Sequence, residues 1–157
     1  MLEPVALIFK LNNGLVKRSL DGLSDDEVWH RIGGSGNPIA WLLGHLTEAR
    51  AALLRELAAD FDPGWGGIFR RGSALADRSG YPPREAIERG WQATHALMRD
   101  AFASAKPEHL AGPARRNVFP GVTTFADEIG GLAFHESYHV GQIGFIRKQL
   151  GHSAVAG

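Results

Sequence analysis

The chain has 157 residues, the size of one ordinary domain, and is long enough to bury a hydrophobic core of its own. Its 17 Lys and Arg residues balance 17 Asp and Glu residues, which argues against a protein that binds nucleic acid or anionic membranes, because such proteins usually carry a basic excess. The chain contains no cysteine, which excludes disulfides, thiolate metal sites and a cysteine nucleophile, so any metal ligands must be nitrogen or oxygen atoms.

The N-terminal segment predicts neither export nor membrane insertion. It lacks the basic start and the long apolar stretch of a secretory signal. No segment of the chain approaches the roughly 20 consecutive apolar residues of a membrane-spanning helix. We therefore expect a cytoplasmic protein without a membrane or nucleic-acid partner.

The first half of the chain predicts two long helices and one short one. Apolar residues recur at helical spacing over residues 4–20. A capping-box pattern begins a short extra helix over residues 24–31. Asn37 and Pro38, a favoured N-cap and a favoured first residue, begin the second long helix, whose apolar stripe extends to about Asp60.

The second half predicts two more long helices, separated by long loops. Residues 61–83 form a loop rich in Gly, Arg and aromatic residues, and loops of about twenty residues are often functional. The third long helix opens near Pro83 and ends at Lys106, and the fourth covers residues 124–150. No run of alternating apolar residues predicts a strand. The pattern therefore predicts an all-α four-helix bundle that forms a single domain over residues 1–157.

The strongest chemical signal is the sequence from His135 to His139 in the fourth helix. Two histidines four positions apart lie one above the other on a helix face, where one metal ion can bind both imidazoles. They lie in or beside the apolar stripe, so they face the bundle interior, where an unpaired imidazole is costly. The alternative is a pair of core histidines that are each satisfied by a hydrogen bond.

The same five residues match the H-E-x-x-H pattern of zinc proteases, in which the glutamate is the general base. The protease interpretation is disfavoured, because Gln142 stands where the extended pattern has a glycine and no glutamate follows His139. The third ligand must therefore come from upstream, and His45 is the best candidate because it borders the apolar stripe of the second long helix. A helix-edge histidine bonded to water or to a neighbour is the alternative. Three imidazoles leave coordination positions open, as in catalytic metal sites.

Residues 37–46 (NPIAWLLGHL) and 135–143 (HESYHVGQI) resemble the DinB-like (damage-inducible) family of bacterial four-helix-bundle proteins. The resemblance extends over nearly the whole chain and implies that His45, His135 and His139 bind a divalent metal such as nickel or zinc. The family includes metal-dependent transferases that use low-molecular-weight thiols, related isomerases and hydrolases, and its members often form homodimers. Any thiol in the chemistry must come from a small molecule, because the chain has no cysteine.

Four further residues are candidates for the site, each with a structural alternative. Glu136 is a candidate general base or hydrogen-bond partner, although a carboxylate that packs between helices or is solvated fits as well. Gln142 is placed to hydrogen-bond a metal-bound water, and His95 and Asn12 are candidates for contacts to substrate in a pocket; structural roles are the alternative for all three.

Other residues carry weaker expectations. Arg70 and Arg71 on the long loop are candidates to hold an anionic substrate, with a solvated loop as the alternative, and three histidines are expected at the surface: His30, His109 and His152. Each glycine inside a helix costs about 1 kcal/mol relative to alanine. We therefore expect those of the fourth helix to allow close packing against a neighbouring or partner helix, or access to the metal pocket: Gly130, Gly131, Gly141 and Gly144.

The favoured hypothesis is a metal-dependent enzyme that acts on a small molecule, either as a thiol S-transferase or as a hydrolase. The first alternative is a non-catalytic module, which binds metal or acts in a stress response through dimerisation. The second is a bundle without metal that buries three histidines. A polar cleft beside the histidines would favour the enzyme, whereas a closed coordination shell would favour the non-catalytic module.

Overall fold

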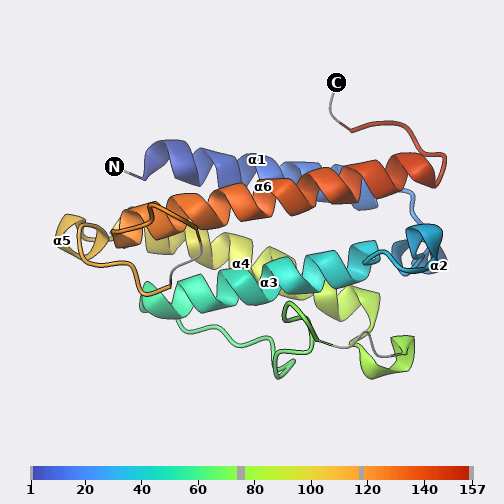
Figure 1. The fold of residues 1–157 in the computed structure, drawn as a ribbon, viewed down its shortest axis with the longest axis horizontal. Helices are drawn as coiled ribbons and strands as arrows, with labels where there is room; N and C mark the ends of the chain where they lie inside the picture. Colours follow the sequence, from blue (N-terminus) through green and yellow to red (C-terminus); the bar gives the residue numbers. More distant parts are fainter. Residues whose placement is uncertain (1, 74–76, 117–118, 156–157) are drawn as a thin grey trace.

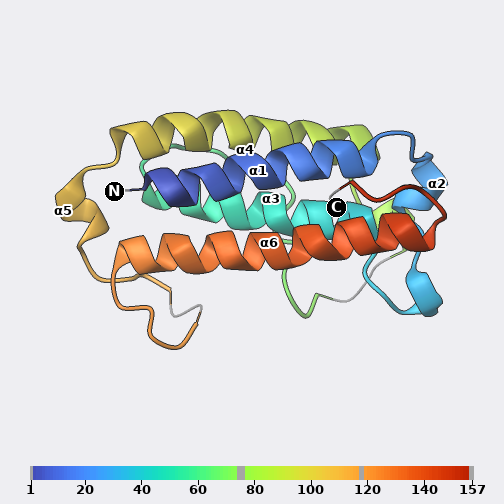
Figure 2. The same ribbon diagram turned by 90° about the horizontal axis from the view of Figure 1, so that it is seen from above.

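The computed structural model describes residues 2–73, 77–116 and 119–155. Four long helices form a bundle, as predicted from the sequence (Figures 1 and 2). They are α1 (Glu3–Leu20), α3 (Ile39–Glu56), α4 (Arg84–Ser104) and α6 (Phe125–Gln149), and the short elements are α2 (Asp25–Val28), α5 (Pro107–Leu110) and the 3-10 turns η1 (Ile32–Gly34) and η2 (Arg78–Gly80). The described ranges contain no strand, only an isolated bridge between Pro113 and Thr124.

Each long helix packs against two others, and two pairs lie diagonally across the bundle. α1 and α3 both contact α4 and α6, so the chain crosses from α1 to the opposite side of the bundle through α2 and η1 (Figure 2). This crossing makes α3 and α6 neighbours, although they are far apart in the sequence. None of the described helices combines the length and the apolarity that crossing a membrane requires.

The ends of α3 differ from the sequence prediction. Pro38 is the N-cap in an extended conformation, with no side-chain cap, so Asn37 does not cap the helix. The helix ends at Glu56 rather than near Asp60 because Ala58 has a left-handed backbone (φ 59), and the Ala59 N–H donates to the Leu54 carbonyl at 2.9 Å. The capping box at Ser24 is present, but its helix ends at Val28 rather than at residue 31; α5 was not predicted.

The long loop after α3 contributes directly to the core. Phe69 is fully buried and packs with α3 and α4 in the cluster around Trp41 and Trp91. An added Cβ at Gly44 would lie 2.5 Å from the Phe69 ring, so this glycine allows the close approach. An added Cβ at three glycines of α6 would meet nothing within 4 Å, so the expected close packing within the chain is wrong for them: Gly130, Gly141 and Gly144.

Candidate metal centre

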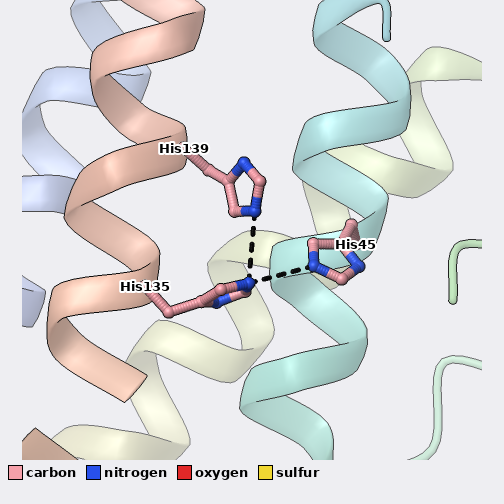
Figure 3. Close-up of side chains that lie close together, drawn as sticks. All are labelled: His45, His135 and His139. Carbon is pink, nitrogen blue, oxygen red and sulfur yellow. Dashed lines mark hydrogen bonds between the residues drawn. The ribbon is translucent and has the colours of Figure 1, made fainter. Parts of the chain in front are cut away.

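Three histidines from two neighbouring helices meet between α3 and α6 (Figure 3). His135 Nε2 lies 3.2 Å from His45 Nε2 and 3.2 Å from His139 Nε2. One nitrogen from each ring lies within 4.8 Å of the other two. The structure therefore brings together all three residues that the sequence predicted as metal ligands.

Neighbouring groups orient two of the three rings. His45 Nδ1 lies 2.8 Å from the Phe69 carbonyl oxygen, and His139 Nδ1 lies 2.6 Å from Gln142 Oε1. Both partners accept hydrogen bonds, so each Nδ1 carries the proton and each Nε2 keeps a free lone pair. Trp41 also stacks on His45, with ring centroids 5.1 Å apart and planes 7° apart. These contacts direct the Nε2 lone pairs toward the shared space.

Burial keeps the three imidazoles neutral, which is the form that binds metal. It is the largest cause of the lowered pKa of each ring. Burial, followed by the charges of His139, His45 and Arg71, lowers the pKa of His135 to about 4. At neutral pH, protons therefore compete weakly for these nitrogens.

The donor set fits a divalent metal of the nickel or zinc type. Such metals bind imidazole nitrogen at about 2.0–2.1 Å, which places two ligands of a tetrahedral site about 3.3 Å apart. The two 3.2 Å separations are close to this value. Imidazole also suits zinc and nickel better than it suits calcium or magnesium, which prefer oxygen ligands.

A cleft of about 630 Å³ opens beside His45, between α3 and the loop that follows it. Burial raises the pKa of Glu48, one of its wall residues, and favours the neutral acid. The other charged residues of the wall are Arg55, Asp60, Asp62, Arg70 and Arg71. The two loop arginines that the sequence marked as candidates for an anionic substrate thus border the histidine site. With three protein ligands and a cleft beside them, the site resembles a catalytic rather than a closed structural metal site.

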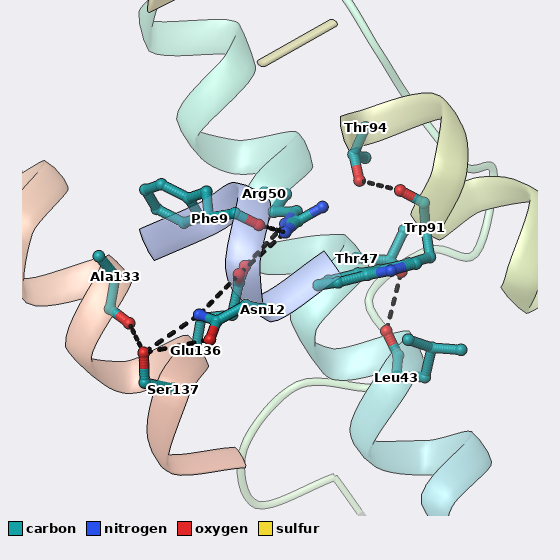
Figure 4. A network of polar contacts seen from close by, with 10 residues as sticks. All are labelled: Phe9, Asn12, Leu43, Thr47, Arg50, Trp91, Thr94, Ala133, Glu136 and Ser137. Carbon is teal, nitrogen blue, oxygen red and sulfur yellow. Dashed lines mark hydrogen bonds and ion pairs between the residues drawn. The ribbon is translucent and has the colours of Figure 1, made fainter. Parts of the chain in front are cut away.

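Glu136 and Asn12 lie in the interior, but they form a network of their own (Figure 4). Both oxygens of Glu136 accept hydrogen bonds from Arg50, at 2.7 and 2.8 Å, and Asn12 Nδ2 donates to Glu136 Oε1 at 3.1 Å. Asn12 also donates to Ser137 Oγ at 3.1 Å. Since Arg50 and Asn12 hold the carboxylate, Glu136 braces the helices in this structure rather than facing the histidine nitrogens.

The remaining histidines lie away from this centre. His95 lines a different cavity. By contrast, Gln142, the other candidate of the sequence, contacts His139 directly. Of the three histidines expected at the surface, only His30 is exposed. His109 stacks on Phe125 (ring centroids 4.8 Å apart), and His152 Nε2 bonds Glu27 at 2.8 Å, so both are half-buried.

The sequence pattern did not predict the roles of the Phe69 carbonyl, Trp41 and Arg50. A backbone carbonyl acts through its position alone and leaves no signature in the sequence. The spacing of Trp41 and His45, one helical turn apart, was a usable signal for their stacking. Arg50 follows Thr47 and Leu46 on the buried face of α3, where a charged residue requires a partner.

The comparisons with known proteins agree with this architecture. The model of the DinB superfamily matches residues 11–143. The chain belongs to the DinB superfamily. Among solved structures, this DinB protein is similar to YfiT from Bacillus subtilis, described as a probable metal-dependent hydrolase with an unusual four-helix bundle topology. The TM-score is 0.60 at 15% identity, over 96% of this chain and 88% of YfiT, which shows a shared fold. No curated protein sequence matches the chain significantly.

Proposed function

We propose that this DinB protein is a metal-dependent enzyme that hydrolyses a small molecule at a three-histidine centre formed by His45, His135 and His139. The observation that carries the proposal is the convergence of three neutral Nε2 atoms beside an open cleft. YfiT, whose fold is similar, is described as a probable metal-dependent hydrolase, and this description supports the same class of reaction. When bound, a divalent metal would supply a nucleophile at neutral pH by lowering the pKa of a coordinated water to about 7.

The residues of the chain bind and orient the reacting groups. Phe69 and Gln142 hold the rings of His45 and His139, so little reorganisation is needed when the ligands engage. Arg70 and Arg71 offer guanidinium groups at the cleft, suited to a carboxylate or phosphate of the substrate. The cleft volume of about 630 Å³ is within the range of small-molecule sites.

Thiol transfer is the alternative reaction at the same centre. It needs the same open metal site and a low-molecular-weight thiol, since the chain has no cysteine. The non-catalytic module is disfavoured because one of the three histidines, His45, lines an open cleft. We propose that the native metal is either nickel or zinc.

We also propose that the protein is a homodimer. The exposed large hydrophobic side chains of the described residues all lie on α1 and α6, which pack side by side: Leu7, Ile8, Leu11, Phe134, Tyr138 and Phe145 (Figure 1). The open space at Gly141 and Gly144 of α6 leaves room for a partner helix to approach this side of the bundle. Exposed apolar side chains gathered on two neighbouring helices are typical of a protein–protein contact.

Metal content tests the function first. Protein purified without chelator is expected to hold one equivalent of nickel or zinc, measured by elemental analysis, and His45→Ala is expected to lose it. His30→Ala, at an exposed histidine outside the cluster, is the matched control and should keep it. Undiminished metal in His45→Ala would contradict the proposed centre.

Chemistry is tested on the loaded protein. Metal-dependent hydrolysis of small anionic esters or amides, absent in His45→Ala, supports hydrolysis. Metal-dependent thermal stabilisation by small thiols instead assigns transfer; at 100 times its Kd a ligand adds about 2.7 kcal/mol. The absence of both responses would favour the non-catalytic module.

A further inference from the structure

A second cavity lies on the other side of the bundle from the histidine cleft. It has a volume of about 880 Å³ and is lined by residues of the first half of α1 and the last turns of α4. These parts of the two helices lie at the end of the bundle where α5 lies (Figure 2). Among the residues that the structure describes, it shares no lining residue with the cleft beside His45. Its contents are therefore independent of the proposed metal chemistry.

The wall of this cavity is mainly apolar. Its inner surface includes side chains that are almost fully buried, and Phe102 adds an aromatic ring that contacts Phe9 (ring centroids 5.5 Å apart). The buried members are Leu2, Phe9, Met98 and Leu110. A cavity of this size with apolar walls and few polar groups has the usual composition of a small-molecule site.

The polar groups of the lining are mostly basic. Lys10 from α1 borders the cavity, and so do His95 and Arg99 from α4. Glu3 lies two turns before Lys10, at the other end of the lining, and Arg99 also contacts Asp100 at 2.8 Å. Among the described ion pairs, none involves Lys10, so its charge is available to a ligand.

The surroundings of His95 favour an anion. Burial and then the positive charges of Arg50, Arg99 and Lys10 lower the pKa of His95. No acidic group is among the causes of this shift. The ring is therefore neutral at pH 7 and has an N–H to donate, with the cationic side chains of Lys10 and Arg99 on the same cavity wall.

We propose that this cavity binds an amphipathic anion, a small molecule with one carboxylate on an aliphatic or aromatic body. The carboxylate interacts with Lys10, Arg99 and the His95 N–H, and the apolar body lies against Met98 and Phe102. The charge at the rim and the apolar wall are complementary to these two parts of the ligand. This site is separate from the metal centre, whose substrate enters by α3.

Calorimetric titration of the intact protein with decanoate tests the proposal. The expected result is one site per chain, at least tenfold tighter for decanoate than for decan-1-ol or decylammonium. His45→Ala should bind decanoate as the wild type does, so failure of the metal proposal and failure of this one are distinguishable. Equal affinity for decanoate and decan-1-ol would overturn the assignment of an anion site.

Two pairs of matched variants locate the binding. Lys10→Glu reverses a rim charge, and Ala103→Phe fills the cavity from an exposed position of α4; each is expected to weaken decanoate binding at least tenfold. Lys17→Glu and Ala96→Phe change exposed residues two turns away on the same helices and should leave the affinity within twofold. If both variants of a pair lost decanoate affinity equally, the result would contradict the placement of the binding site in this cavity. A change of oligomeric mass in Ala103→Phe without a change of affinity would instead assign the cavity to a contact between copies of the chain, and would also overturn the proposal.

Discussion

Arg50 and Glu136 form a two-pronged ion pair in the interior of the bundle, with Nε–Oε2 and Nη2–Oε1 distances of 2.7 and 2.8 Å. The pair joins α3 to α6, the two helices that carry the histidines, and Glu136 is the chain neighbour of His135. Arg50 also lies 3.5 Å from the centre of the Trp91 ring. A protein in which apolar residues replace a buried ion pair is often as stable as the original, so stability alone does not account for this pair. We attribute to it instead the fixed placement of α6 against α3.

Breaking this pair on one side is expected to be costly. Glu136→Gln leaves the Arg50 charge buried without its counter-ion, so the free energy of unfolding should fall by about 3–5 kcal/mol in a urea titration. The double variant Arg50→Met/Glu136→Leu removes both charges and should regain much of this loss. If the pair places α6, metal affinity should remain weak in the double variant even where stability returns. A double variant that is no more stable than Glu136→Gln would contradict this account of the pair.

Gln142 is expected to act on metal affinity more than on stability. Gln142→Ala removes the acceptor that fixes the His139 ring, and loss of such an outer contact typically lowers metal affinity 10- to 100-fold. Competition titration with a metal indicator measures this change. Gln149→Ala, at the exposed end of the same helix, is the control and should bind metal as the wild type does. Equal affinity of the two variants would show that Gln142 does not orient the ligand.

Much of the site could be predicted because helical spacing places residues in space. Because His135 and His139 are four residues apart, they must share a helix face. His45 lies beside an apolar stripe, so its side chain could be predicted to face the bundle interior. The role of Glu136 could not be decided in this way, because its partner Arg50 is 86 positions away and lies on another helix. Helix limits depended on single backbone conformations such as that of Ala58, which has no side-chain signature.

Gly44 is predicted to tolerate no side chain. A Cβ there would lie 2.5 Å from the Phe69 ring, which is fully buried, so Gly44→Ala should destabilise the fold by about 1–3 kcal/mol through overpacking. It should also weaken metal binding, because the displaced Phe69 carries the carbonyl that fixes His45. Gly130→Ala is the control: its Cβ meets open space inside α6, and helix propensity predicts stabilisation by up to about 1 kcal/mol. Unfolding curves and metal titration of both variants check the contrast.

Phe145 is predicted to lie in the contact between two copies of the chain. It is 58% exposed on α6, so Phe145→Glu should leave the fold of the monomer intact while placing two charges in a desolvated contact. Light scattering after size exclusion should give twice the chain mass for the wild type and a single chain mass for the variant. Gln149→Glu should remain dimeric. A wild-type protein that is monomeric at all concentrations would contradict the homodimer.

Phe69 links the loop to the site in two ways, since its side chain fills the core and its carbonyl holds His45. An opening of the loop that withdraws the Phe69 ring from the core would also release the His45 imidazole. The rate at which the ion exchanges with solution should then follow the frequency of this opening, and a bound ion should slow proteolytic cleavage of the segment. Retention of the metal would therefore be governed by the lifetime of a hydrophobic contact as much as by the strength of its coordinate bonds.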